Sequence, residues 1–348
     1  MIAAQIPTQR PPDARLMIID FEGSISQASR ASFVDFLRAG DLVIANNAAT
    51  LPASLQGEHL ATRASIEVRL AGRRSLAGND LREFCAIVFG AGDFRTRTED
   101  RPLPPKLAPG DRLSLGPLAA TVDELLGHPR LISLRFDGDT DSIWAGLARH
   151  GRPIQYSHVA TPLSLWEVWT SIAGPPVAFE PPSAGFALDW RSLRAMRDRE
   201  VAFSTITHAA GISSTGDPEL DQRLPLDEPY RIPESTACAI RQAQSHNGKI
   251  VAIGTTVVRA LEHAAGPDGS ISAGDGLATG RIDAKTRLRV VDAILSGTHE
   301  PGTSHYQLLR AFVNDDWLNL ANNKLDEWGF RTHEYGDSVL IERSRRLP

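Results

Sequence analysis

Four short loops rich in glycine, serine and threonine carry residue types that suit the binding of a polar small molecule. Each lies at the end of a predicted strand, and together they cover residues 183–186, 208–216, 254–256 and 297–304. In an open α/β sheet, the carboxyl ends of strands and the first turns of helices gather around one crevice. The loops therefore predict a crevice whose backbone N–H groups bind a nucleotide- or nucleoside-like ligand.

The loop at 254–256 has the clearest local pattern. Ile250–Ile253 is a short apolar run that is typical of a buried strand. Gly254 ends the run, and Thr255 and Thr256 are residue types that cap helices. A helix start offers unpaired N–H groups that suit a carboxylate or a phosphate. On spacing alone an ordinary turn between a strand and a helix is favoured, because no glycine-rich nucleotide-binding motif occurs.

Three residues are the best candidates for acid–base chemistry: His208, Glu228 and His299. Histidine titrates near neutrality, and both histidines lie in small-residue loops at predicted strand ends. A hydrogen-bonded structural role remains the favoured alternative for either histidine. The chain has no G-x-S-x-G and no pair of histidines four residues apart, so an α/β-hydrolase and a zinc hydrolase are unsupported.

The elements that must position these loops alternate between strands and helices. Apolar runs predict strands at 15–20, 41–46, 201–207, 250–253, 288–291 and 338–341. Helical spacing predicts helices at 29–39, 142–150, 164–173, 189–199, 234–246, 305–312 and 316–328. Short alternating segments between 57 and 136 indicate a small barrel or sandwich. We expect an α/β main domain (1–56 and 141–348) with an inserted small antiparallel β-barrel domain (57–140), and a loop at 267–280.

Composition limits the classes of partner. The net charge of −5 argues against sequence-independent nucleic-acid binding through a broad basic surface. The Arg-rich segment 189–199 is favoured as a solvated helix face, with a phosphate-contact patch as the alternative. Two cysteines are too few for a disulfide framework or a cysteine zinc site, so we expect no metal. No apolar run approaches the ~20 residues of a membrane span, and no signal peptide is evident, so we expect a cytoplasmic protein without membrane contact.

Five segments carry a resemblance to a known family. The best match is Gly248–Glu262, which is similar to G-x-x-I-A-V-G-T-T-x-x-R-x-L-E. Residues 40–57 resemble G-D-L-L-V-x-N-D-T-R-V-x-P-A-R-L-x-G, and Pro182–Phe186 resembles P-T-A-G-L-H-F. Residues 290–301 and 335–340 are similar to V-V-D-x-L-x-T-N-F-H-L-P and to S-Y-G-D-A-M-L. Along the chain these segments occur in the same order as the family's motifs. Over nearly its whole length the chain therefore resembles the S-adenosylmethionine:tRNA ribosyltransferase-isomerase family of queuosine biosynthesis.

The resemblance implies an α/β domain joined to a small β-barrel. It also implies transfer and isomerisation of the ribosyl group of S-adenosyl-L-methionine onto a 7-aminomethyl-7-deazaguanine base in tRNA, with release of adenine and methionine. In such an enzyme His208, Glu228 or His299 would move protons. The residues that would bind the donor are Ser183, Ala184, Gly185, Gly211, Gly254, Thr255, Thr256, Arg259, Tyr335 and Asp337.

Several motif positions differ from the family pattern and leave alternatives open. Asn47–Ala49 replace the motif's D-T-R, and residues 207–214 keep His208 and Gly211 but lack a T-F pair. One alternative is a diverged paralogue that binds a nucleoside-like ligand or a partner without ribosyl transfer. Another is an enzyme with the same donor and a different acceptor. The acceptor, the catalytic base and the oligomeric state stay open.

Overall fold

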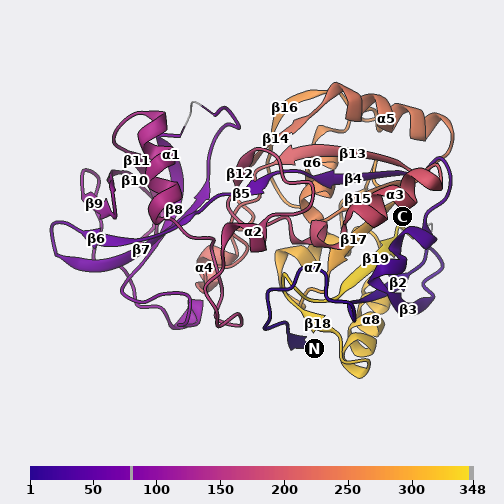
Figure 1. Cartoon of the computed structure of the whole chain (residues 1–348), viewed down its shortest axis with the longest axis horizontal. Helices are drawn as coiled ribbons and strands as arrows, with labels where there is room; N and C mark the ends of the chain where they lie inside the picture. The colour runs from indigo at the N-terminus through magenta and orange to yellow at the C-terminus, as the bar shows by residue number, and fades with distance from the viewer. Residues whose placement is uncertain (79–80, 345–348) are drawn as a thin grey trace.

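The computed structural model describes residues 1–78 and 81–344, and its largest element is a mixed sheet in the α/β part of the chain (Figure 1). Nine strands pair in the order β16-β14-β13-β4-β15-β17-β19-β2-β3. Their bounds are β16 Gly274–Ala278, β14 Glu228–Ile232, β13 Ala202–His208, β4 Leu42–Asn46, β15 Ile250–Ile253, β17 Ala293–Gly297, β19 Ser338–Glu342, β2 Arg15–Ile19 and β3 Ile25–Ser29. Strands β13, β4, β15 and β17 run parallel, so their carboxyl ends share one edge.

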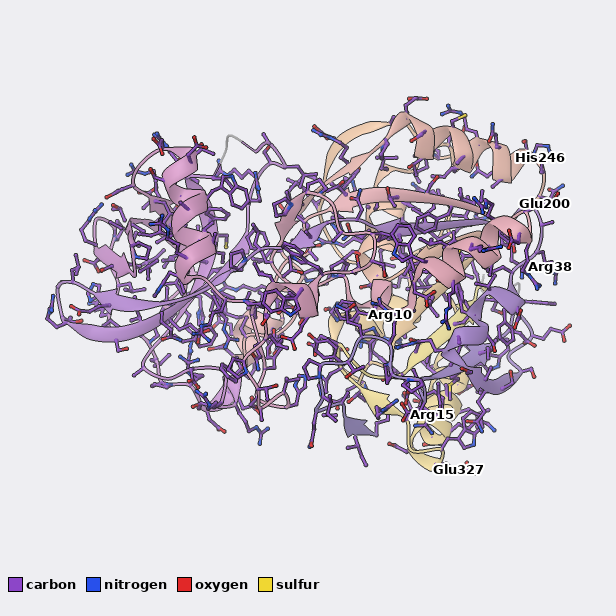
Figure 2. The ribbon with its side chains drawn as sticks, in the orientation of Figure 1. Arg10, Arg15, Arg38, Glu200, His246 and Glu327 are labelled. Carbon is purple, nitrogen blue, oxygen red and sulfur yellow. The ribbon has the colours of Figure 1, made fainter. Side chains whose placement is uncertain are left out.

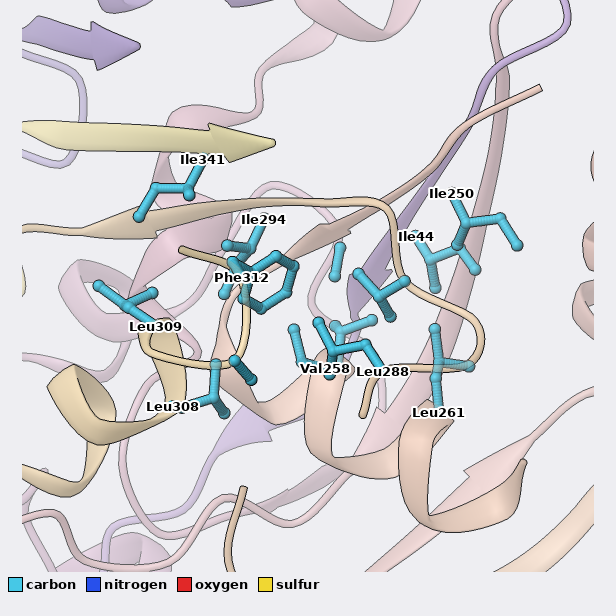
Figure 3. Close-up of a cluster of buried hydrophobic side chains, with 14 of the residues drawn as sticks. Ile44, Ile250, Val258, Leu261, Leu288, Ile294, Leu308, Leu309, Phe312 and Ile341 are labelled. Carbon is cyan, nitrogen blue, oxygen red and sulfur yellow. The ribbon is translucent and has the colours of Figure 1, made fainter. Parts of the chain in front are cut away.

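Helices cover both faces of this sheet because its central strands are apolar on both sides. Leu42 and Ile44 pack with α5 (Glu234–Ser245), α6 (Thr255–Ala264), α7 (Ser304–Leu309) and α8 (Asp315–Glu327), as Figure 3 shows for part of this core. Val43 and Ala45 point the other way, toward the 3-10 helix η1 (Arg30–Phe36) and α3 (Trp190–Asp198). Continuous apolar runs of this kind are expected of parallel strands that are buried on both faces.

The second part of the molecule is a closed antiparallel barrel, at the left of Figure 1. Its strands follow the order β10-β11-β8-β7-β6-β9, with bounds β6 Ser54–His59, β7 Ala64–Gly72, β8 Glu83–Phe89, β9 Arg112–Leu115, β10 Leu118–His128 and β11 Leu131–Phe136. A closed barrel leaves no unpaired sheet edge, and its inward side chains form a core of their own. The predicted fold class, an α/β domain with a small antiparallel barrel, is confirmed.

The boundaries of the inserted domain, predicted at 56/57 and 140/141, stay a prediction. Helix α1 (Thr140–His150) follows the last barrel strand and places Ile143 and Leu147 in the barrel core. We therefore propose that the inserted unit extends to His150.

Three of the secondary-structure predictions were wrong in part. The segment 29–39 forms only the 3-10 helix η1, and 164–173 forms only the short α2 (Leu165–Val168). Helix α2 ends because Trp169 turns extended and donates its Nε1 proton to the carbonyl of Thr50. The segment 267–280, predicted as a loop, contains β16, which pairs with β14.

The strand predicted at 288–291 does not form, and β17 begins at Ala293 instead. The carboxylate of Glu262 on α6 accepts hydrogen bonds from the backbone N–H groups of Arg289, Val290 and Val291. These N–H groups are therefore taken by a side chain rather than by a neighbouring strand. The apolar side chains that suggested a strand still reach the core.

Smaller elements complete the fold. Strand β1 (Ile2–Ala3) pairs with β18 (Arg331–Thr332), and β5 (Ala49–Thr50) pairs with β12 (Pro176–Ala178). The short helices η2 (Thr98–Asp100), η3 (Ser183–Ala187) and α4 (Pro218–Asp221) lie in connecting segments. Within the described part of the chain, no helix combines the length and the apolar character needed to span a membrane.

Candidate functional site

The predicted loops meet at the edge where the parallel strands end. His208, Asn46, Gly254 and Gly297 stand at or just after the carboxyl ends of β13, β4, β15 and β17. A Cβ atom added at Gly254 would lie 3.2 Å from the Cβ of Ala184, so η3 packs directly on the turn before α6. Ser183, Ala184 and Gly185 therefore belong to the same edge as Thr255 and Thr256, as the crevice hypothesis requires.

Gly254 is needed both for its backbone and for the space above it. Its φ of +91° lies in the region that L side chains rarely adopt, and Ala184 lies close above. We expect Gly254→Ala to lower the free energy of unfolding by about 1–3 kcal/mol more than Gly40→Ala. Gly40 has nearly the same φ, +88°, but no atom within 4 Å of an added Cβ. Urea unfolding measures both, and equal losses would show that the contact with Ala184 is unimportant.

His208, Glu228 and Arg259 form one buried cluster below this edge. Arg259 donates from Nη1 to the carboxylate of Glu228, and from Nη2 to the carbonyls of Leu226 and Ala278 at 2.8 and 2.9 Å. The other oxygen of Glu228 accepts the N–H of Gly211 at 2.6 Å. Arg259, predicted to bind the donor, is thus paired with a carboxylate of the protein itself.

Burial disfavours the charged forms of both His208 and Glu228. Burial, helped by the charge of Arg259, lowers the pKa of His208 to about 3, so its ring stays neutral. Burial also raises the pKa of Glu228, while Arg259 and the N–H of Gly211 oppose that rise. Asn46 fixes the backbone on both sides of His208, donating to its carbonyl at 2.9 Å and accepting from its N–H at 3.0 Å. We propose that His208, Glu228, Gly211 and Arg259 hold β13, β14 and α6 together.

Tyr335 and Asp337 have separate surroundings although they are close in sequence. The ring of Tyr335 stacks on Phe186 of η3 with centroids 5.4 Å apart, which links the 335 loop to the crevice edge. The carboxylate of Asp337 instead accepts the N–H groups of Arg15 and Arg331, both at 2.8 Å, and pairs with both guanidinium groups. Asp337 therefore joins β2 and β18, and we propose a structural role for it.

His299 lies among other histidines at the end of β17. Its Nε2 lies 2.8 Å from Oγ of Ser296, and its ring stacks on His305 with centroids 4.8 Å apart. Burial lowers the pKa of His299 well below its ordinary value, and His305 and His333 act in the same direction. A neutral imidazole at the end of a parallel strand can accept a proton from a bound ligand.

A small cavity of about 20 Å³ lies beside His158 and Glu334. Apolar side chains of residues 154–168 form much of its wall, and its polar lining residues are Gln155, Tyr156, His158, Glu180, Glu334 and Tyr335. A cavity of this volume has room for about one water molecule. The sequence predicted only Tyr335 from this lining.

Glu180 is the most notable of the missed residues. Burial raises its pKa to about 7, against the opposing hydrogen bonds from Ser213 and Tyr156. The hydroxyl of Tyr156 lies within hydrogen-bond distance of both Glu180 Oε1 and, at 3.1 Å, the carbonyl of Ser214. One hydroxyl proton serves only one of these acceptors, so a protonated Glu180 that donates to Tyr156 satisfies all three groups. Glu180 is therefore poised to gain or lose a proton near neutrality.

Comparison with known proteins gives matches along the whole chain. The family model described as "Queuosine biosynthesis protein" matches residues 1–341. The chain is 30% identical over 346 residues to a Gloeobacter violaceus protein named S-adenosylmethionine:tRNA ribosyltransferase-isomerase, covering 97% of this chain and 92% of that protein. It is 29% identical to a Pelobacter propionicus protein of the same name, covering 98% and 96%.

A solved structure agrees with the fold. The crystal structure of an S-adenosylmethionine tRNA ribosyltransferase from Thermotoga maritima matches with a TM-score of 0.51 at 21% identity. The match covers 97% of this chain and 96% of that one, so both the α/β part and the barrel are included.

Proposed function

This chain belongs to the queuosine biosynthesis protein family, and from that membership we propose that it transfers and isomerises the ribosyl group of S-adenosylmethionine onto a 7-aminomethyl-7-deazaguanine base in tRNA. The observation that carries the proposal is the family match over residues 1–341, together with the meeting of the predicted loops at one sheet edge. The names of the relatives support S-adenosylmethionine and tRNA as the substrates.

The start of α6 fits the carboxylate of S-adenosylmethionine. Its N-cap is Gly254, so no side chain caps the first N–H groups, and the first turn carries no acidic residue. Thr255 and Thr256 are only partly buried and add two hydroxyl groups. Free N–H groups and the positive end of a ten-residue helix favour an anion. Ser183–Gly185 would then close over the donor from η3.

The groups proposed for proton transfer lie outside the cluster of His208, Glu228 and Arg259. Glu180 lines the small cavity and His299 lies two residues beyond β17, whereas the carboxylate of Glu228 is paired with Arg259. Loss of adenine from the donor leaves positive charge on the ribose, and the carboxylates of Glu180 and Glu334 would stabilise that charge. We assign His299 and Glu180 as the acid–base pair of the proposed reaction.

The test is adenine release. Purified protein is incubated with S-adenosylmethionine and tRNA that carries the 7-aminomethyl-7-deazaguanine base, and free adenine is quantified by chromatography. We expect adenine to appear only when both substrates are present. Absence of adenine despite measured binding of both substrates would contradict the proposal.

A second candidate is a paralogue that binds the donor without turnover. Asn47, which stands at the motif's aspartate position, is engaged locally, since its Oδ1 accepts a hydrogen bond from Thr207 at 2.7 Å. A carboxylate that the family motif provides is therefore absent from this edge. A calorimetric titration that shows S-adenosylmethionine binding, combined with no adenine release, would favour this candidate.

An exposed aromatic and basic surface fits tRNA as the acceptor. Trp166 and Trp190 are 74% and 77% exposed, and Trp169 next to α2 is partly exposed. Residues 9–10 contact the two segments that carry these tryptophans. Gln9 donates to the carbonyl of Trp169, and Arg10, labelled in Figure 2, donates to the carbonyl of Leu188. Exposed indole rings stack on unpaired bases, and arginines of the neighbouring α3 can contact phosphates.

We expect Arg194→Ala to weaken tRNA binding and to reduce the slope of log K against log salt by about 1, as for the loss of one phosphate contact. The matched control is Arg241→Ala. Each arginine is exposed and paired with a carboxylate, but Arg241 is on α5, on the opposite face of the sheet. Filter binding at several salt concentrations measures both variants, and equal slopes would remove α3 from the tRNA surface.

A further inference from the structure

Two segments far apart in the chain bring three potential metal ligands together beside the cavity. His158 lies in the segment after α1, and His333 and Glu334 lie in the turn before β19. Nε2 of His158 is 2.9 Å from Oε2 of Glu334, across 176 residues of sequence. The rings of His158 and His333 stack with centroids 4.2 Å apart and planes 15° apart. One ligand atom from each residue lies within 4.8 Å of the others.

We propose that His158, His333 and Glu334 form a binding site for a divalent transition-metal ion of the zinc type. Two imidazole nitrogens and one carboxylate oxygen are a donor set for zinc and its neighbours, whereas magnesium and calcium prefer oxygen ligands. Three protein ligands leave a further position on the ion for water or a ligand. Within residues 1–78 and 81–344 this is the one group of three such side chains.

The distances suit an ion after a small adjustment. Ligand atoms about 2.1 Å from a tetrahedral ion stand roughly 3.4 Å from one another. The pair at 2.9 Å is already that close. The remaining approach falls to His333, the most exposed of the three, whose ring must turn out of its stack on His158 so that a ring nitrogen faces the ion.

The position of His333 is specific rather than incidental. Its φ of +68° lies in the left-handed region, which non-glycine residues rarely adopt. In this conformation the ring of His333 stacks on His158, while the residue as a whole stays exposed. His158 and Glu334 also line the cavity, so the free position of the ion would face Tyr156 and Glu180.

The expectation of no metal rested on the small number of cysteines and on the absence of two histidines four residues apart. Sequence motifs for metal sites place their ligands a few residues apart on one helix or one turn. Here only His333 and Glu334 are neighbours, and the third ligand comes from a distant loop that tertiary packing places beside them.

The test is a zinc titration of the full-length protein after removal of metals with a chelator, with neither S-adenosylmethionine nor tRNA present. We expect one zinc ion per chain by calorimetry, and the same stoichiometry by elemental analysis after dialysis. Loss of a residue that only hydrogen-bonds a metal ligand already weakens metal binding about 10–100-fold, so His158→Ala and Glu334→Gln should each weaken binding at least about 100-fold.

The matched control is His246→Ala. His246 is an exposed histidine that caps the C-terminal end of α5 (Figure 2) and does not line the cavity, so its removal should leave the affinity unchanged. Thermal melting of each metal-free variant checks its folding, and Glu334→Gln keeps the side-chain shape if His158→Ala does not fold. Zinc affinity that is absent, or that is equal in the wild-type, Glu334→Gln and His246→Ala proteins, would overturn the proposal. Because no substrate is present, this outcome is independent of the proposed reaction.

Discussion

Arg259→Ala is expected to lower the free energy of unfolding by about 3–5 kcal/mol, because it leaves the buried carboxylate of Glu228 without its partner. Arg259 also satisfies the carbonyls of Leu226 and Ala278, which would lose their donor at the same time. Urea unfolding followed by circular dichroism measures the change. The result separates a structural cluster from a ligand-binding arginine, because a ligand contact alone would leave the unliganded stability nearly unchanged.

The matched control is Arg231→Ala. Arg231 pairs with Asp275 by two hydrogen bonds, but both side chains are exposed, so its removal should change the stability by no more than about 1 kcal/mol. A loss for Arg259→Ala as small as that of the control would contradict the structural role. In that case Arg259 would return to the list of donor-binding residues.

Glu180→Gln is expected to lower kcat by about 10²–10⁴-fold at neutral pH, with a smaller effect on KM, because the amide cannot take or give a proton. Wild-type kcat should also show a transition near pH 7 that the variant lacks, since the pKa of Glu180 is about 7. The titratable groups around it are Tyr156 and Glu334, and Arg69 faces the ring of Tyr156. Unchanged kcat would remove Glu180 from the chemistry.

Glu180→Gln should also change how the free energy of unfolding depends on pH. The folded pKa of Glu180 is raised from 4.5 to about 7, so the folded state holds a proton that the unfolded state loses between these values. Wild-type stability should therefore fall, relative to Glu180→Gln, by up to about 3 kcal/mol as the pH rises through this window. Unfolding at pH 5 and pH 8 measures this difference. The exposed Glu327→Gln is the control, and a pH-independent difference for Glu180→Gln would contradict the raised pKa.

Much of the fold could be predicted from local patterns. Continuous apolar runs such as Leu42–Ala45 and Ile250–Ile253 mark strands that are buried on both faces, and both form central strands of the sheet. Strands β14 and β16 were missed because their sequences carry Pro229, Gly274 and Gly276, which usually weaken strands. Pairing with neighbours across the sheet overrides that local preference.

In the candidate site, too, local sequence predicts some residues and not others. The loops around Gly254 and Ser183 could be predicted because small polar residues and glycine at a predicted strand end indicate a turn. Glu180 could not, because its raised pKa arises from burial and from contacts with Tyr156 and Ser213, which are 24 and 33 residues away. His208 and Glu228 were predicted from residue type, which does not reveal that Arg259 pairs with Glu228 or that burial lowers the pKa of His208.

The most direct test of the central claim follows the ribosyl group itself. S-adenosylmethionine labelled in its ribose carbons is incubated with the protein and tRNA that contains the 7-aminomethyl-7-deazaguanine base, and the digested tRNA nucleosides are measured by mass spectrometry. We predict that the labelled ribose carbons appear on the deazaguanine nucleoside in amounts equal to the adenine released. Adenine release with no label in the tRNA would contradict ribosyl transfer to this acceptor, and labelled donor that stays bound and intact would contradict the enzymatic function.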